Sequence, residues 1–473
     1  MVVYQIFVDR FEKGIEKKED LYPTQIKNWE KKPHRGKLSP KDGCYTHEME
    51  FWGGDLVGIT NRLSYLKDDL GIDAIYLTPI CKAYTNHKYD TIDYFQIDPQ
   101  FGTLKDLKTL VQEAHKLGIQ VILDCVFNHV GKKSPWFESA VQNPNSEYRN
   151  FFSFSDSFRY GYKAWGNVAN LPELNLENPL VQEKILEVAA HYLAIVDGLR
   201  LDVAFELGPE FLQRITEMAH KIKPDSKVIG EIWSYPGEWL QKVDGLMNYH
   251  LRQLIIELIH GNIECLQFGR IIEKMIQDSG IESICQCWNI LSSHDTMRLK
   301  NLFPKEDLRK IALVLQFTLP GIPMIYYGEE LGMSGGDDPL NRGSMQWKSN
   351  EEENQDWNFY QKLIALRNRN PALTAGSFVL LETKSLLAFC RKTKLFKEMI
   401  LVIANTQSHP VQEVLSIPEY RLTNSASLKD LESDKEYKNF SGCLKIELPP
   451  RSFAILSPVI EENACYNPYK RIR

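Results

Sequence analysis

Residues 104–127 read LKDLKTLVQEAHKLGIQVILDCVF, a helical pattern followed directly by a strand pattern. Apolar residues at 104, 107, 110, 111 and 114 recur at the spacing of one helix face, and Gly118 is the expected C-terminal cap. The run 119–127 is apolar on both faces, as a strand inside a parallel sheet is. This stretch therefore predicts a helix–strand unit of an α/β protein.

The same alternation of apolar runs and helical segments recurs along the chain. The runs lie at residues 3–11, 72–80, 119–127, 196–204, 227–233, 243–249, 289–295 and 322–330. Helical patterns at 180–196 and 209–222 separate some of them. Eight such units predict a (β/α)₈ TIM barrel, for which about 250 residues is typical and insertions extend the length.

Two connections are too long for plain loops, and the C-terminal part has a different pattern. Residues 12–60 form a Lys-rich insertion, and residues 130–176 predict a small excursion domain over the barrel mouth. The barrel itself is then expected at 1–129 and 177–372. Short alternating strands without helical periodicity predict an antiparallel β-sandwich domain at 373–473.

Composition excludes several classes of protein. The chain has 43% hydrophobic and 25% charged residues and a net charge of −6, which is ordinary for a soluble globular protein. The basic stretch 27–41 is expected to be a solvated loop, because no nucleic-acid-binding motif accompanies it. Without a signal peptide or a membrane-length apolar run, the chain is expected to be cytoplasmic. Its nine cysteines, an odd number, suit buried thiols in a reducing compartment.

Ionisable residues stand at four of the expected strand ends. The active site of a TIM barrel lies where the strands end, at their C-terminal edge. The candidate groups there are Asp124 with Asn128 and His129, Arg200 with Asp202, Glu231, and His294 with Asp295. Their convergence on one mouth predicts an active site.

Two of these acids suit different chemical roles. Arg200 and Asp202 are two residues apart, so they face the same side of a strand, and a guanidinium favours a charged carboxylate. A purely structural ion pair explains that spacing equally well. Glu231 stands beside Ile232 and Trp233, surroundings that favour the protonated form. One charged and one protonated carboxyl, about 5–5.5 Å apart, are what retaining glycoside hydrolysis requires.

Four ordered motifs carry a family resemblance. They are residues 124–129 (DCVFNH), 198–204 (GLRLDVA), 230–233 (GEIW) and 293–295 (SHD). Together they resemble the α-amylase family, glycoside hydrolase family thirteen. Within it, YQIFVDRF (4–11), NHKYDTIDYFQID (86–98), MNY (247–249) and the stretch 320–347 look most like the group of neopullulanase, cyclomaltodextrinase and maltogenic amylase.

The resemblance implies a retaining hydrolase of α-1,4-glucosidic bonds in maltodextrins, cyclodextrins, starch or pullulan fragments. It makes Asp202 the nucleophile, Glu231 the acid/base and Asp295 the stabiliser of the distorted sugar. The substrate-binding residues that it implies are Tyr89, His129, Arg200, Trp233, His294, Asp338 and Arg342. An α-1,6-glucosidase or a 4-α-glucanotransferase on the same scaffold remains the alternative, and a non-catalytic glucan-binding protein is disfavoured because all three acids are present.

Three departures from that group leave finer properties open. Leu199 and Phe205 replace the usual Trp and Asn near the nucleophile, which bears on the acceptor side. Glu173 replaces a lysine in a stretch associated with linkage choice. The chain starts at barrel strand one, without the N-terminal β domain that builds dimers in this group, so the oligomeric state stays open.

No cofactor or metal is expected in the chemistry. Asn128 matches a calcium ligand of classical α-amylases, but the insertion lacks a dense run of Asp and Asn, so a structural calcium stays open. Asp124, His129 and His294 could be imagined as metal ligands, although Arg200 would repel the ion. The expected partner is an α-glucan oligosaccharide, with no nucleic acid and no membrane.

Overall fold

The computed structural model describes residues 1–14, 24–347, 354–424 and 426–460. Eight parallel strands close into a barrel, in the order β1, β12, β11, β10, β9, β8, β7 and β4. Their bounds are β1 (Val3–Ile6), β4 (Ala74–Leu77), β7 (Gln120–Cys125), β8 (Gly198–Leu201), β9 (Lys227–Ile232), β10 (Gly245–Asn248), β11 (Trp288–Asn289) and β12 (Ile322–Tyr326). Each overlaps one predicted run, so the predicted TIM barrel is confirmed.

The strands are shorter than the apolar runs that predicted them. The run at 289–295 was expected to be a strand ending in His294 and Asp295, but β11 stops at Asn289. This prediction was wrong because Ile290 and Leu291 are buried in the loop that follows the strand. Loops at a barrel mouth can be as apolar as strands when other segments cover them.

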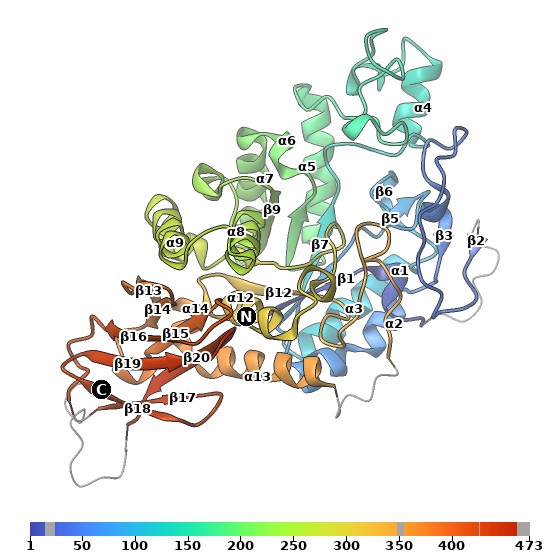
Figure 1. Cartoon of the computed structure of the whole chain (residues 1–473). Helices are drawn as coiled ribbons and strands as arrows, with labels where there is room; N and C mark the ends of the chain where they lie inside the picture. Colours follow the sequence, from blue (N-terminus) through green and yellow to red (C-terminus); the bar gives the residue numbers. More distant parts are fainter. Residues whose placement is uncertain (15–23, 348–353, 425, 461–473) are drawn as a thin grey trace.

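Helices cover the outside of the barrel (Figure 1). The main ones are α3 (Leu104–Lys116), α5 (Pro179–Leu193), α7 (Pro209–Ile222), α8 (Tyr249–His260), α9 (Cys265–Ser279), α12 (Glu306–Thr318) and α13 (Gln355–Arg369). The helix α3 begins with a capping box between Thr103 and Asp106. Gly118 lies just beyond its end with a φ of 69°, a left-handed conformation that suits glycine.

Alternate residues of each strand pack into two separate cores. Outward residues pack against the helices, as Leu199 and Leu201 of β8 do. Inward residues fill the barrel interior, and they include Val3, Ala74, Ile122, Ile229, Trp288, Ile322 and Met324. The interior is therefore solid apolar packing at this level, and any polar group must lie above it, toward the mouth.

Two insertions rise on the mouth side of the barrel. The first follows β1 and contains β2 (Thr24–Gln25), η2 (Thr46–Met49) and β3 (Glu50–Phe51); part of it, 15–23, lies outside the described residues. The second follows β7 and carries α4 (Pro135–Gln142), which stands at the end of the molecule farthest from the C-terminal sheet (Figure 1).

The C-terminal part is an eight-stranded antiparallel sheet in the order β13, β14, β15, β20, β17, β18, β19 and β16. Their bounds are β13 (Ser377–Leu380), β14 (Leu387–Lys392), β15 (Ile400–Asn405), β16 (Val411–Ser416), β17 (Ser427–Asp430), β18 (Glu436–Phe440), β19 (Cys443–Leu448) and β20 (Ser452–Pro458). The sheet curls around one apolar core to which both halves contribute, for example Leu401 and Leu444. The end of the predicted domain, 461–473, lies outside the described residues.

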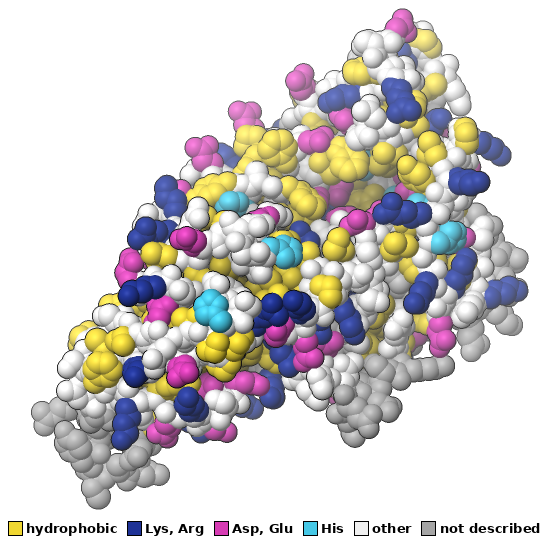
Figure 2. All heavy atoms as spheres, in the orientation of Figure 1, with side chains coloured by type: hydrophobic (Ala, Val, Ile, Leu, Met, Phe, Trp, Pro, Cys, Tyr) yellow, Lys and Arg dark blue, Asp and Glu magenta, His cyan; other side chains and the backbone are white. Residues whose placement is uncertain are grey.

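The surface carries charges of both signs, intermingled on the face that Figure 2 shows. Across the described ranges, no helix is both long and apolar enough to cross a membrane. The eight cysteines in those ranges are all free thiols, and seven of them are buried. Cys465 lies outside those ranges.

Candidate active site

The polar residues of the mouth continue the inward-facing rows of the barrel core. On β7, Asp124 lies two residues after Ile122, which belongs to the apolar layer. On β9, Glu231 lies two residues after Ile229 of the same layer. On β8 the same step leads from Gly198 to Arg200. Since residues two apart share a strand face, these three polar side chains must meet above the core.

The side chain of Arg200 is fully buried and contacts three carboxylates. Its Nη1 donates to both oxygens of Asp124 at 2.7 and 2.9 Å and to Oδ1 of Asp202 at 3.0 Å. Its Nη2 forms an ion pair with Oε2 of Glu231, also at 3.0 Å. Asp124 is held in turn by the hydroxyls of Tyr76 and Tyr89, which donate to its Oδ2.

Arg200 lies beside Asp202, as the sequence predicted, and its guanidinium lies equally close to Glu231. Burial raises the pKa of Asp202 well above its usual range, Arg200 opposes this shift, and Glu231 adds to it. Burial also raises the pKa of Asp124 and of Asp295. The site therefore favours uptake of a proton among its acids.

Glu231 accepts hydrogen bonds on both carboxylate oxygens. The backbone N–H of Val203 donates to Oε2 at 2.9 Å, and the indole N–H of Trp233 donates to Oε1 at 2.9 Å. Trp233 therefore supplies a hydrogen-bond donor to Glu231 as well as aromatic surroundings. Val203 reaches Glu231 with φ 47° and ψ 41°, a left-handed conformation that is rare for a β-branched residue.

Asp295 and His294 lie on the loop after β11, and the loop after β12 holds them. The side-chain amide of Asn341 donates to the carbonyl of His294 at 2.7 Å, and Nε of Arg342 donates to the same carbonyl at 3.0 Å. Arg342 also pairs with Asp295 at 3.4 Å and with Asp338 at 3.0 Å. The third acid is thus positioned by residues 338–342.

The ring of His294 connects this loop to the carboxylate cluster. The hydroxyl of Tyr89 lies 2.6 Å from its Nε2, the amide of Gln5 lies 2.6 Å from its Nδ1, and the Tyr89 ring stacks on it with an interplanar angle of 4°. Burial, with Arg342 and Arg200 nearby, lowers the pKa of His294 well below its usual value. The imidazole is therefore neutral.

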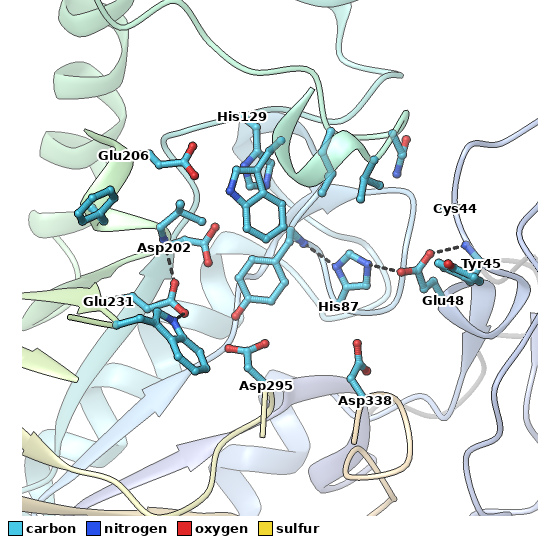
Figure 3. A pocket seen from close by; sticks show the side chains of 18 of the residues that line it. Cys44, Tyr45, Glu48, His87, His129, Asp202, Glu206, Glu231, Asp295 and Asp338 are labelled. Atoms are coloured by element: carbon cyan, nitrogen blue, oxygen red, sulfur yellow. Dashed lines mark hydrogen bonds and ion pairs between the residues drawn. The ribbon is translucent and has the colours of Figure 1, made fainter. Parts of the chain in front are cut away.

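These groups open into a cavity of about 650 Å³ (Figure 3). Eight of the ten predicted site residues line it: Tyr89, His129, Asp202, Glu231, Trp233, Asp295, Asp338 and Arg342. Arg200 and His294 lie behind this lining, fully or nearly fully buried. The ring of His129 stacks on Trp165 of the excursion, and burial lowers its pKa to about 3.

Several residues of the site were not found from the sequence. Gln5 and Tyr76 lie within apolar strand runs. The alternation of residues along each strand could have predicted that their side chains point into the barrel. Cys44, Tyr45 and Glu48 line the cavity from the insertion after β1, and nothing in their sequence context predicts this.

Asn128 alone does not make a calcium site. Its side-chain amide donates to Glu206 at 3.3 Å. Among the residues that the structure describes, no three His, Cys, Asp or Glu side chains come together as metal ligands. A structural calcium stays a prediction.

The model of the alpha amylase catalytic domain matches residues 5–376. This chain belongs to the alpha-amylase family. It is 37% identical to a cyclomaltodextrinase of Thermoanaerobacter pseudethanolicus and 34% identical to neopullulanase 2 of Thermoactinomyces vulgaris, over 96% of this chain and 77% of each relative.

One solved structure is similar over nearly the whole length of the chain. The cyclic alpha-maltosyl-(1→6)-maltose hydrolase of Arthrobacter globiformis superposes with a TM-score of 0.81 at 28% identity, over 97% of this chain and 98% of that one. The family membership that the four motifs predicted is confirmed, and with it the assignment of the protein as a glycosidase of the α-amylase type.

Proposed function

We propose that this protein hydrolyses α-1,4-glucosidic bonds of maltodextrins, cyclodextrins, starch or pullulan fragments with retention of configuration. The observation that carries the proposal is the pair Asp202 and Glu231, held by the two terminal nitrogens of Arg200 at one cavity wall. Retaining enzymes need two such carboxyls about 5–5.5 Å apart. The names of the two curated relatives support an α-glucan as the substrate.

In the first step, Asp202 attacks the anomeric carbon and Glu231 gives its proton to the leaving glycosidic oxygen. The carbon–oxygen bond of the substrate breaks as the bond to Asp202 forms. Oε1 is the oxygen of Glu231 suited to this transfer, because its partner, the indole N–H of Trp233, belongs to a side chain that lines the cavity and is 56% exposed. Oε2 stays bound to the backbone of Val203.

In the second step, Glu231 takes a proton from water, and the water oxygen displaces Asp202 from the anomeric carbon. Arg200 stays beside both acids throughout, so its charge stabilises whichever of them is ionised. Asp295 hydrogen-bonds the distorted sugar, the face of Tyr89 supports its ring, and the neutral imidazole of His294 holds the Tyr89 hydroxyl from behind the cavity lining. Neither step uses a cofactor.

This mechanism is tested by the product anomer and by an isosteric variant. With maltohexaose, NMR should detect the α-anomer first; a β-anomer formed first contradicts retention. Asp202→Asn should lower turnover by roughly 10⁴-fold or more, because the nucleophile is lost. An Asp202→Asn enzyme that keeps its turnover contradicts the assignment of the nucleophile.

Asp338→Asn is the matched control, because the same isosteric change is made at a carboxylate that pairs with Arg342 at the cavity rim. It should raise KM more than it lowers kcat, since it weakens sugar binding without touching the reacting bond. Products from pullulan and panose decide between this function and an α-1,6-glucosidase, and transfer products from maltotriose reveal a glucanotransferase.

A further inference from the structure

The polar layer above the barrel core contains Gln5, which the proposed mechanism does not use. Gln5 lies two residues after Val3 on β1, so its side chain points inward, above the apolar layer to which Val3 belongs. Its register partner on β4 is Tyr76, whose hydroxyl donates to Asp124. Gln5 is fully buried and does not line the cavity. Any part that it has in the reaction must therefore be exerted through a neighbour.

That neighbour is His294. The amide nitrogen of Gln5 lies 2.6 Å from the ring nitrogen Nδ1. The other ring nitrogen, Nε2, lies 2.6 Å from the hydroxyl of Tyr89 and 3.1 Å from Oδ2 of Asp295. A neutral imidazole carries one N–H proton, so one of its nitrogens donates and the other accepts. The position of that proton decides what Tyr89 and Asp295 receive from the ring.

The direction of these hydrogen bonds follows from Asp124. Its carboxylate accepts from Nη1 of Arg200 on both oxygens and from the hydroxyls of Tyr76 and Tyr89 on Oδ2. Donors on both oxygens favour the ionised form, and an ionised carboxylate can only accept. The Tyr89 hydroxyl therefore gives its hydrogen to Asp124. On the proposed mechanism, the proton of the acid cluster is carried by Glu231.

The oxygen of Tyr89 can then only accept from His294. Because its one hydrogen points to Asp124, Nε2 of His294 must carry the ring proton and donate it to this oxygen. Since the imidazole is neutral, Nδ1 has no proton and is an acceptor. The amide of Gln5 presents its N–H group to Nδ1, which matches this direction.

The opposite tautomer would oppose each of these contacts. A proton on Nδ1 would point at the N–H group of Gln5, and the unprotonated Nε2 would face the carboxylate of Asp295. The Tyr89 hydroxyl would turn its hydrogen toward Nε2, and Asp124 would lose a donor. A carboxamide does not titrate, so the side chain of Gln5 presents the same donor at every pH at which the enzyme works.

We infer that Gln5 is a positioning residue that fixes His294 as the tautomer protonated at Nε2. In this tautomer the imidazole donates to the hydroxyl of Tyr89 and to the carboxylate of Asp295, which faces the cavity (Figure 3). Both residues then keep the orientation in which they meet the sugar. The effect on turnover rests on the proposed function, whereas the tautomer itself does not.

The tautomer is measured by NMR on protein whose histidines carry nitrogen-15. The signals of His294 are the ones that disappear in the His294→Asn variant. In the wild-type enzyme, Nε2 should resonate as a protonated ring nitrogen and Nδ1 as an unprotonated one. A proton on Nδ1 overturns the inference, whatever the enzyme cleaves.

Gln5→Glu keeps the shape of the side chain and places an acceptor at Nδ1. Because an imidazole is a stronger base than a carboxylate, Nδ1 should take up the proton between them. With the hydrogen bonds reversed, kcat should fall roughly 10- to 100-fold and KM should change less than about threefold, since Gln5 does not touch the sugar. A variant with a protonated Nδ1 and an unchanged kcat overturns the inference.

Gln5→Met removes the donor without offering an acceptor. The proton should then stay on Nε2, because Tyr89 and Asp295 still accept from it, and kcat should fall less than in Gln5→Glu. Equal losses of kcat in the two variants would assign the effect to packing and overturn the inference.

Gln316→Glu is the matched control, because it makes the same change at another buried glutamine. The amide of Gln316, on α12, donates to the carbonyls of Asn289 and Met324 at 2.9 and 2.8 Å. The control should lower the free energy of unfolding and leave kcat and the signals of His294 unchanged. An equal loss of kcat in the control would mean that stability alone explains the effect, which overturns the inference.

The two proposals fail differently. A wild-type enzyme that cleaves no α-glucan contradicts the proposed function, and the NMR result still decides the tautomer. An enzyme that cleaves α-glucans with a proton on Nδ1 of His294 leaves that function standing and contradicts only the role of Gln5.

Discussion

Buried arginines lie at both ends of the barrel, and their surroundings differ completely. Arg200 at the mouth contacts three carboxylates. At the opposite end, Arg367 donates only to backbone carbonyls, those of Met1, Phe317, Gly321 and Leu373. Arg391 also donates to backbone carbonyls, those of Thr318, Gly376 and Ser377.

The difference shows how the same side chain serves chemistry at one end and architecture at the other. Phe317 and Thr318 are the last residues of α12, whose terminal carbonyls have no partner inside the helix. Arg367 of α13 and Arg391 of β14 supply those partners and so attach the C-terminal sheet to the barrel. Burial, with Arg391 nearby, lowers the pKa of Arg367 to about 9, whereas Asp124 and Glu231 outweigh burial and raise the pKa of Arg200.

The largest effect should come from removing the charge of Arg200 at the barrel mouth. Arg200→Met should lower kcat/KM by roughly 10³-fold or more, because the three acids lose the group that positions them. The protein should still fold, since the acids can take up protons instead of staying charged. The acid limb of the pH–rate profile should move to higher pH, because Arg200 lowers the pKa of Asp202. An unmoved limb contradicts this role.

Removing the donors of Arg367 at the opposite end of the barrel should affect stability but not catalysis. Arg367→Met leaves buried carbonyls without a donor and should lower the free energy of unfolding by about 3 kcal/mol. Urea denaturation measures this loss, and kcat/KM at 25 °C should match the wild type. A variant that instead shifts the pH–rate profile, as Arg200→Met should, would show that the two ends are coupled.

Arg298 is intermediate between Arg200 and Arg367, because it contacts both a carboxylate and backbone carbonyls. Its carboxylate partner should make a smaller, pH-dependent contribution to the free energy of unfolding. It contacts one carboxylate, Glu329, at 3.4 Å and donates to the carbonyls of Tyr327 and Asn341. Burial raises the pKa of Glu329 to about 7, although Arg298 opposes it. The folded state therefore binds this proton more tightly than the unfolded chain does. The stability that protonated Glu329 contributes to the folded state is fully present below about pH 4.5 and is lost as the pH rises through about 7.

Glu329→Gln should remove that dependence. Relative to the variant, the wild type should lose on the order of 2 kcal/mol of unfolding free energy between pH 4.5 and 8. Urea denaturation of both proteins across this range measures the difference, and unrelated groups cancel in it. Parallel stability curves would mean that Glu329 does not titrate in this window.

The sequence predicts the barrel and the meeting of its acids, because strand direction and the period of two determine where Asp202 and Glu231 point. It does not predict how one guanidinium is shared. Arg200 lies two residues from Asp202 along the chain, and the pairing of β8 with β7 and β9 brings Asp124 and Glu231 close to it as well. Local neighbours therefore did not reveal that Arg200 also contacts Glu231 or that Trp233 donates a hydrogen bond to it.

Contacts between loops were beyond prediction for a related reason. Tyr45 belongs to a stretch without periodicity, and its position depends on Asn86 and on the packing of Gly43 against Ala169. His294 and Asp295 were placed on a strand because their neighbours are apolar, whereas Asn341 and Arg342 hold them in a loop. Such partners lie tens of residues away and have no local signature.

The left-handed backbone of Val203 has a consequence for how this protein can evolve. A β-branched residue there costs of order 1–3 kcal/mol, and glycine would relieve it. Glycine adopts this conformation without that cost, but its backbone also leaves it more easily, so the N–H that donates to Oε2 of Glu231 would be held less rigidly. The stability of the fold and the fixed position of Glu231 therefore place different demands on this one position.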